Sequence, residues 1–281
     1  MRLPDRLRDA ASMLTGEERE MLRVLAAEHP LRRGCVIDAG CFLGGSTLAI
    51  TLGVRARDRH VPVHTYDRFI LDWPSLVSYP ALLAGLSEGD SFRDRFEQQL
   101  GAELELITIH QGDILGMLWD GEPIEMLFID IAKSWEISDH IHQQWLPALV
   151  PGTGVVIQQD YVHEWCPWLH VLMELLAEHF QPIATVGGVS RVFRCLSAVP
   201  PDAIPQRLRE LPQDWLLALF DRSANRFSGE ERAVVECARA VLLADLGQVE
   251  QARRHLDSLA RSDVQGERFP SVLDDVTAYV P

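Results

Sequence analysis

Short apolar runs alternate with amphipathic stretches from about residue 35 to residue 196 of the chain. Runs rich in Val, Ile and Leu indicate strands that are buried on both faces, and the stretches between them have the period of helices. This alternation predicts an α/β protein with a mostly parallel, doubly wound sheet. The expected strands are the apolar runs at 35–38, 61–66, 104–110, 124–129, 154–159, 183–186 and 191–196.

The end of the sheet and the C-terminal region show two other patterns. Only Gly-Gly-Val-Ser separates the last two expected strands, which indicates a hairpin and therefore one antiparallel strand at an edge. After residue 200 the pattern is helical only, with an antiparallel pair expected on either side of Gly247. We therefore expect an N-terminal helical segment at 1–30, an α/β domain at 31–199 and a C-terminal helical region at 200–281.

Charge and composition exclude several partners. The formal net charge is −15, which disfavours nucleic acid and anionic membranes. No apolar run reaches the ~18 residues that span a bilayer, and the N-terminus has no signal-peptide core, so we expect a cytoplasmic protein. The five cysteines lack a metal-ligand spacing and are expected to be reduced and buried.

Acidic residues stand at the ends of successive expected strands. They are Asp38, Asp67, Asp113 and Asp130. Ligands of open α/β sheets bind outside the carboxyl ends of strands, so these acids mark a candidate site.

The first of these acids precedes a glycine turn with Gly40 and Gly44, where a ligand can approach the backbone closely. The turn is not the Gly-x-Gly-x-x-Gly of a pyrophosphate binder, because Phe42 stands at the second glycine. An acid here would repel a pyrophosphate, whereas it suits the ammonium and sulfonium charges of S-adenosylmethionine.

The later acids also have places in this interpretation. Asp67 can accept hydrogen bonds from both hydroxyls of a ribose. Asp113 can accept a hydrogen bond from the amino group of an adenine, while Ile114 covers the adenine ring. Each acid has a structural alternative as a turn or helix-capping residue.

The ordered motifs resemble class I S-adenosylmethionine-dependent methyltransferases. Residues 36–47, Val-Ile-Asp-Ala-Gly-Cys-Phe-Leu-Gly-Gly-Ser-Thr, are similar to the first motif, and Tyr66-Asp67 and Gly112-Asp113 to later ones. Residues 128–136 and 155–161 resemble blocks of small-molecule O-methyltransferases of the macrocin type. The resemblance implies a Rossmann-like seven-stranded sheet with an antiparallel last strand, cofactor contacts that include Ser46, and methylation of a small-molecule hydroxyl on a sugar or secondary metabolite.

The chemical candidates follow the fourth and fifth expected strands. Lys133, the only lysine of the chain, follows Asp130 by three residues. The macrocin-type block has histidine at this position, but enzymes of the catechol O-methyltransferase type have a lysine that acts as general base. Lys133 and Asp130 are therefore the first catalytic candidates. His163 is the rival base, with a solvated helix-cap residue as its alternative.

A divalent cation is an open question at this stage. The resemblance implies that metal-dependent relatives bind it through the acid at Asp130 and a pair that here reads Gln159-Asp160. Carboxylate and amide oxygens suit Mg²⁺. Alternatively, the charge of Lys133 replaces the metal.

Three functions are weighed. The leading one is a methyltransferase with a small-molecule acceptor, without nucleic acid or membrane, and with a homodimer left open. The rival is a non-catalytic protein of the same fold that acts through its C-terminal helices, and an NAD-dependent oxidoreductase is disfavoured by Phe42. Residues 69–90 are either a lid over the acceptor or a packed surface loop. His140 and His142 are expected at the surface.

Overall fold

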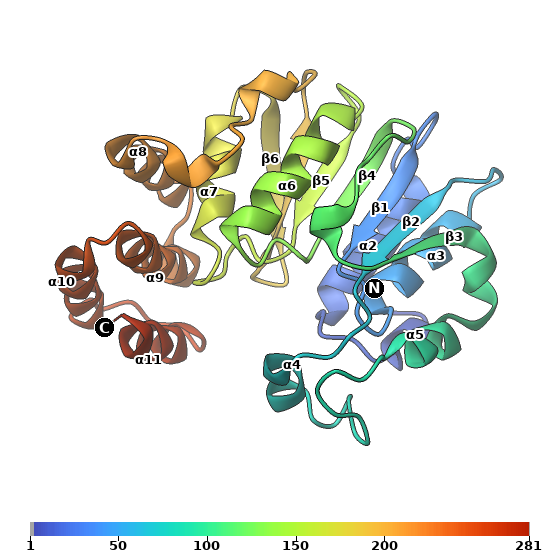
Figure 1. The fold of residues 1–281 in the computed structure, drawn as a ribbon, viewed down its shortest axis with the longest axis horizontal. Coiled ribbons are helices and arrows are strands. Elements are labelled where there is room, and N and C mark those ends of the chain that lie inside the picture. Colours follow the sequence, from blue (N-terminus) through green and yellow to red (C-terminus); the bar gives the residue numbers. More distant parts are fainter. Residues whose placement is uncertain (1–2, 281) are drawn as a thin grey trace. The chain divides into compact units, whose positions relative to one another are not determined.

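The computed structural model describes residues 3–280 and shows a seven-stranded sheet with strand order β3-β2-β1-β4-β5-β7-β6 (Figure 1). The strands are β1 (Cys35–Ala39), β2 (Val63–Asp67), β3 (Ile107–Gln111), β4 (Ile124–Ile129), β5 (Val155–Gln158), β6 (Phe180–Val186) and β7 (Ser190–Cys195). Every strand predicted from the sequence is present. The predicted Rossmann-like, doubly wound α/β fold is confirmed.

Strand β1 lies between β2 and β4 and runs parallel to both. Val36 is opposite Val63 on one side and Met126 on the other. β1 and β4 are buried along their whole length, because neighbours cover both faces. Since these strands are parallel, their carboxyl ends meet at one edge of the sheet, which is where the sequence places Asp38 and Asp67.

The hairpin predicted at the end of the sheet is confirmed, but its position is corrected: the antiparallel strand β7 lies between β5 and β6, so β6 forms the edge. β6 and β7 pair antiparallel, with Val186 opposite Ser190. Gly187 and Gly188 connect them with φ angles of 61° and 73°, a region that glycine adopts without strain. β3 differs from its prediction, because it begins at Ile107 and not at 104. The residues before it form a 3₁₀ helix, Gly101–Leu106.

The first of two compact units comprises the described residues up to 131 together with 148–157. Its helices are α1 (Asp5–Arg8), α2 (Gly16–Glu28), α3 (Gly45–Arg55), α4 (Trp73–Ser78) and α5 (Arg93–Leu100). Helix α2, within the N-terminal segment predicted to be helical, begins with a capping box: the Thr15 hydroxyl accepts a hydrogen bond from the backbone N–H of Glu18, and the Glu18 carboxylate accepts one from the backbone N–H of Thr15. α2 packs against α3.

The second unit comprises residues 132–147 and 158–281, of which the last is not described. Its helices are α6 (Trp135–Trp145), α7 (Pro167–Leu175), α8 (Gln213–Ala224), α9 (Gly229–Asp245), α10 (Val249–Ala260) and α11 (Phe269–Tyr279). α9 and α10 form the predicted pair around Gly247, whose φ is 78°. The helices after residue 200 thus group with the α6, α7 and β6–β7 segments. The boundaries expected at residues 30 and 199 stay predictions.

His142 is buried, contrary to the expectation of a surface residue. It lies on the face of α6 that also buries Ser138, Ile141 and Trp145, a helical spacing that the sequence already contained. Burial lowers the pKa of His142 to about 4, so the ring is neutral and accepts from the Gln158 amide at 2.7 Å. His140 is partly exposed.

The five cysteines are all buried and free, as expected. Among the described residues, no helix is both long and apolar enough to cross a membrane.

Candidate functional site

Asp38 lies near the carboxyl end of β1 and is fully buried. Its Oδ2 accepts hydrogen bonds from the Ser46 hydroxyl at 3.1 Å and the Thr47 hydroxyl at 2.5 Å. Its Oδ1 is buried without a hydrogen-bond partner. Burial raises the pKa of Asp38 to about 6, although the two hydroxyls oppose the shift. A buried carboxylate with one unsatisfied oxygen is suited to a cationic group of a ligand.

The predicted Gly40 and Gly44 both have the left-handed conformation, with φ angles of 90° and 93°. A Cβ on Gly40 would lie 2.8 Å from the carbonyl of Asp130, and one on Gly44 would lie 3.0 Å from the Phe96 ring. The chain therefore needs glycine at both positions for its own packing. Asp130 lies close to this turn, since its backbone N–H donates to the carbonyl of Ala39, the last residue of β1, at 2.7 Å.

Asp67 fixes the backbone of this turn. Its Oδ2 accepts from the N–H of Phe42 at 2.9 Å, and its Oδ1 accepts from the N–H of Phe69 at 2.8 Å. Both phenylalanines have positive φ angles, 46° and 56°, a region that is sterically unfavourable for residues with a β-carbon. Burial raises the pKa of Asp67. Asp67 thus has a structural role that the sequence analysis missed, and each oxygen keeps a second lone pair for a ligand.

Asp113 and Ile114 lie at the start of a 3₁₀ helix, Ile114–Gly116. The Asp113 carboxylate accepts from the N–H of Leu115 at 3.1 Å and is exposed. This is the turn-capping alternative that the sequence left open. Its role toward an adenine stays a prediction.

Lys133 contacts Asp160 through an ion pair between Nζ and Oδ2. The Asp160 side chain is mostly buried, with 16% of it exposed, whereas that of Lys133 is 50% exposed. Burial alone would raise the pKa of Asp160, but the charges of Lys133, His163 and Arg268 outweigh it and lower the pKa. The structure thus brings together the predicted base, a predicted metal ligand and the rival base.

His163 is partly exposed, and its Nδ1 lies 3.3 Å from Glu164. Arg268, at the start of α11, lies 3.5 Å from the same Glu164 oxygen and donates to the Gly188 carbonyl at 3.2 Å. Further along α11, Tyr279 packs edge-on against Trp165. Helix α11 therefore contacts the loop after β5, which carries Asp160 and His163, and no sequence signal predicts this contact.

The proposed metal ligands are partly consistent with a cation. Gln159 has a buried Oε1 without a hydrogen-bond partner, as an amide ligand would. The Asp160 carboxylate, however, is in contact with the Lys133 ammonium. Asp130 belongs to the first compact unit, whereas Gln159 and Asp160 belong to the second.

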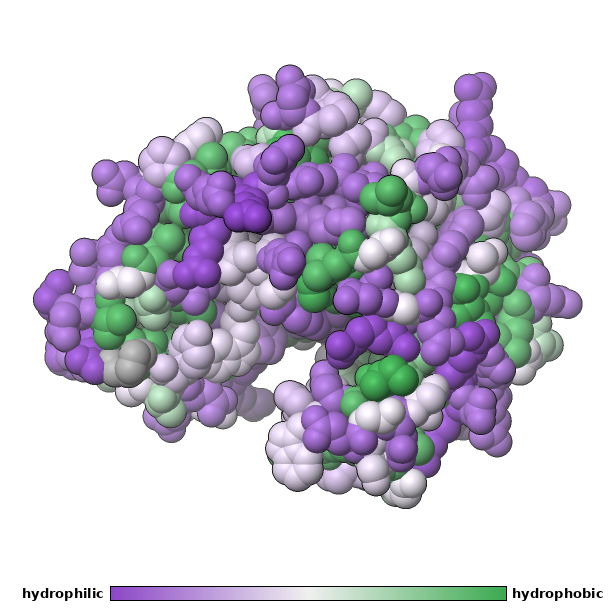
Figure 2. Space-filling view, in the orientation of Figure 1, coloured by the Kyte–Doolittle hydropathy of each residue, from purple (hydrophilic) through white to green (hydrophobic). Residues whose placement is uncertain are grey.

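The insertion after β2 contains α4, which the sequence analysis did not predict. None of the residues of α4 is buried, and the side chains of Trp73 and Val77 are strongly exposed. Asp72 caps the helix by accepting from the N–H of Ser75 at 3.0 Å. Figure 2 shows hydrophobic atoms at the surface of the segment that holds α4, among hydrophilic ones. Exposed apolar side chains suit a segment that contacts a ligand, so the lid remains a prediction.

Comparison with known proteins addresses the fold. No family model and no curated protein matches the chain. The solved O-methyltransferase NovP is 17% identical, covers 66% of this chain and 82% of its own, and gives a TM-score of 0.51. The O-methyltransferase from Bacillus cereus, solved in complex with SAH, is 15% identical, with 70% and 93% covered and a TM-score of 0.50. The chain has the fold of these O-methyltransferases. The resemblance seen in the motifs is therefore confirmed at the level of fold.

Proposed function

We propose that this protein is an S-adenosylmethionine-dependent methyltransferase that methylates a hydroxyl of a small molecule, such as a sugar or secondary metabolite. The observation that carries the proposal is the buried Asp38 carboxylate, which has one oxygen without a hydrogen-bond partner at the carboxyl edge of a methyltransferase-type sheet. The ammonium of the cofactor would satisfy that oxygen. A pyrophosphate would be repelled by it.

When bound, S-adenosylmethionine supplies a methyl group on a positively charged sulfur. Asp38 would hold the amino acid part, and the turn from Gly40 to Gly44 would contact it through backbone groups. Asp67 would accept from the ribose through its remaining lone pairs. Asp113 and Ile114 would contact the adenine.

The hydroxyl of the acceptor must lose its proton as its oxygen bonds to carbon. Lys133 follows β4 closely in the chain and is the group that we propose to handle this proton. Asp160 fixes its ammonium group, which can also stabilise the negative charge that develops on the oxygen. His163 is the second candidate for the base.

The Lys133–Asp160 ion pair supports a reaction in which lysine replaces the charge of a divalent cation. If a cation does bind, Asp130, Gln159 and Asp160 would hold it. A Mg²⁺ there would polarise the hydroxyl of the acceptor. Full turnover after exhaustive treatment with EDTA is the expected result, and loss of turnover that Mg²⁺ restores would contradict it.

Calorimetric titration tests the cofactor. We expect S-adenosylhomocysteine to bind at one equivalent and NAD not to bind. Asp38→Asn removes the charge within a similar volume and should abolish this binding, whereas Asp58→Asn, at an exposed position, should leave it unchanged. Absence of binding by S-adenosylhomocysteine to the folded wild-type protein would refute the proposal.

The acceptor is best sought with a labelled methyl group. The protein is incubated with cell extract and methyl-labelled S-adenosylmethionine, and small-molecule products are separated from protein and nucleic acid. We expect the label on a small molecule, in a bond that has the stability of an ether. Label on protein or nucleic acid would contradict the proposed acceptor class while leaving the cofactor site intact.

A further inference from the structure

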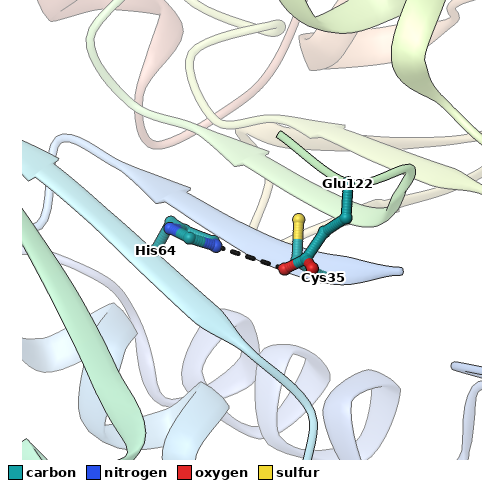
Figure 3. Close-up of side chains that lie close together, drawn as sticks. All are labelled: Cys35, His64 and Glu122. Atoms are coloured by element: carbon teal, nitrogen blue, oxygen red, sulfur yellow. Dashed lines mark hydrogen bonds and ion pairs between the residues drawn. The ribbon is translucent and has the colours of Figure 1, made fainter. Parts of the chain in front are cut away.

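A group of potential metal ligands lies at the opposite end of the strands from Asp38. Cys35 is the first residue of β1, and His64 is the second residue of β2. Glu122 lies two residues before the start of β4. Their ligand atoms, one from each side chain, all lie within 4.8 Å of one another. Figure 3 shows the three side chains converging, with the His64 ring directed at the Glu122 carboxylate. The group is thus separate from the proposed cofactor site.

We propose that Cys35, His64 and Glu122 bind one Zn²⁺ ion, with water as the fourth ligand. This proposal is independent of the methyltransferase function. The chemistry of the ligands selects the metal, because a thiolate and an imidazole favour zinc over the hard cations Mg²⁺ and Ca²⁺.

The distance between two of the ligand atoms fits a tetrahedral zinc site. His64 Nε2 lies 3.4 Å from Glu122 Oε1. Two atoms that each lie about 2.0 to 2.1 Å from a tetrahedral zinc are roughly 3.3 to 3.4 Å apart. The His64 and Glu122 atoms therefore already have the spacing of two zinc ligands, and Cys35 Sγ lies within 4.8 Å of ligand atoms of both residues.

The second nitrogen of His64 already has the partner that a metal-binding histidine needs. Its Nδ1 lies 3.0 Å from Nε2 of His110. A histidine that ligates a metal through one nitrogen normally makes a hydrogen bond through the other, which fixes the ring. The Trp119 ring packs edge-on against His64 at 5.3 Å and restrains it further. Nε2 is thus the nitrogen that faces the other two ligands.

The backbone near Cys35 holds the Glu122 segment in place. The Cys35 N–H donates to the Pro123 carbonyl at 2.9 Å. A Cβ on Gly34 would lie 2.0 Å from the same carbonyl oxygen, so only glycine permits this approach. The backbone segments that carry Cys35 and Glu122 are therefore held together before any metal binds, which lowers the entropic cost of binding.

Zinc binding is a simple exchange of a proton for the metal. The S–H bond of Cys35 breaks, its proton passes to solvent, and the sulfur keeps the electron pair that binds Zn²⁺. Affinity should therefore rise with pH. The ion would join the amino-terminal ends of β1 and β2 to the segment before β4, and should stabilise the first unit.

Metal titration of the full-length protein, freed of metal by a chelator and kept reduced, tests the site. We expect one equivalent of Zn²⁺ to bind in competition with a colorimetric chelator and to raise the Tm. Co²⁺, used as a spectroscopic probe, should give the charge-transfer band of a thiolate ligand. Cys35→Ala should remove this band, and His64→Gln and Glu122→Gln should weaken binding. His110→Gln should weaken it by roughly tenfold.

Matched controls separate a specific site from general effects. Cys237→Ala alters another buried cysteine, and His60→Gln alters an exposed histidine near the start of β2; both should bind as wild type. Glu122 is exposed, so its variant should fold normally even if Cys35→Ala does not. Failure to bind one equivalent, a Co²⁺ spectrum without the thiolate band, or wild-type affinity in Glu122→Gln would overturn the proposal. The His64–Glu122 contact would then be a plain hydrogen bond.

Discussion

The ammonium nitrogen of Lys133 contacts the Oδ2 atom of Asp160, and most of the Asp160 side chain is buried while half of the Lys133 side chain is exposed. An ion pair of this kind favours the charged state of both partners. Lys133 is therefore held as a positive charge, and it must lose its proton before it can act as a base. Charge stabilisation and proton transfer are separable roles.

Replacing Lys133 with arginine separates these roles, because arginine keeps the charge and does not release its proton. We expect Lys133→Arg to bind S-adenosylhomocysteine as wild type and to lose turnover by about 10²- to 10⁴-fold, the usual contribution of a general base. Single-turnover assays with labelled cofactor measure this. Wild-type turnover in Lys133→Arg would exclude the base role and leave only charge stabilisation.

Because Lys133 is the only lysine, reductive methylation provides a related experiment, in which the side chain keeps its charge and can still release a proton but has fewer N–H groups to donate. The reagent modifies this side chain and the α-amino group. The Lys133→Arg protein, treated in the same way, is the control for the α-amino group.

The raised pKa of Asp38 predicts how cofactor binding depends on pH. Asp38 must be ionised to accept from an ammonium group, and its pKa in the folded protein is about 6. Affinity for S-adenosylhomocysteine should therefore fall as the pH drops through 6, and binding near this pH should release protons. Calorimetry in buffers of different ionisation enthalpy measures the release. A constant affinity between pH 5 and pH 8 would contradict an ionic role for Asp38.

The same shift predicts an effect on stability. A carboxyl whose pKa is raised on folding contributes stability below its unfolded value, near 4, and loses it as the pH rises through 6. The protein without cofactor should gain about 2 to 3 kcal/mol at pH 8 from Asp38→Asn, because the buried charge is removed while an amide oxygen still accepts from Ser46 and Thr47. Urea unfolding at pH 5 and pH 8 tests this. The gain should be about half as large at pH 5.

Asp67 should matter for folding even without cofactor. Asp67→Ala leaves the N–H groups of Phe42 and Phe69 without their acceptor, and both residues already have positive φ angles. We expect a loss of about 1 to 3 kcal/mol in the free energy of unfolding. Asp113→Ala is the control, because its carboxylate caps an exposed turn. Equal stability of the two variants would show that Asp67 has no role in folding and acts only in ligand binding.

The strands and the hairpin could be predicted because each is a local pattern: a short apolar run, or two runs joined by glycines. The lengths of β3 and of the 3₁₀ helix before it, Gly101–Leu106, could not be predicted, because the apolar residues of 104–106 are compatible with either structure. His142 shows a different limit. Its helical spacing with Ile141 and Trp145 is present in the sequence, but the polar side chain of histidine predicts a surface position on any face of a helix.

The candidate site was predicted in its residues more than in its contacts. Asp38 and Asp67 could be predicted from their positions at strand ends. The backbone N–H groups that donate hydrogen bonds to Asp67 could not, because they depend on the shape of the turn. Thr47 was missed, although it follows Ser46 directly and gives Asp38 its shorter hydrogen bond. The contact of Arg268 with Glu164 joins distant parts of the chain, and no periodicity reveals it.

Arg268 should act as a positioning residue for the loop after β5. It links α11 to Glu164 and to Gly188, and its charge lowers the pKa of Asp160. We expect Arg268→Gln to reduce kcat/KM for the acceptor by roughly tenfold to hundredfold, since small displacements of catalytic groups are costly. Cofactor affinity should not change. Because the pKa of Asp160 rises when this cation is lost, the acidic limb of the pH–rate profile should move to higher pH.

Two variants control this experiment. Arg261→Gln removes an exposed arginine shortly before α11 and should behave as wild type. Arg268→Lys keeps the positive charge and should restore most of the pH profile. It should restore less of the kcat/KM for the acceptor, because lysine cannot reproduce the geometry of the guanidinium. A general loss of stability would lower the amount of folded protein without moving the acidic limb. An unmoved limb in folded Arg268→Gln would therefore show that Arg268 serves only to anchor the helix.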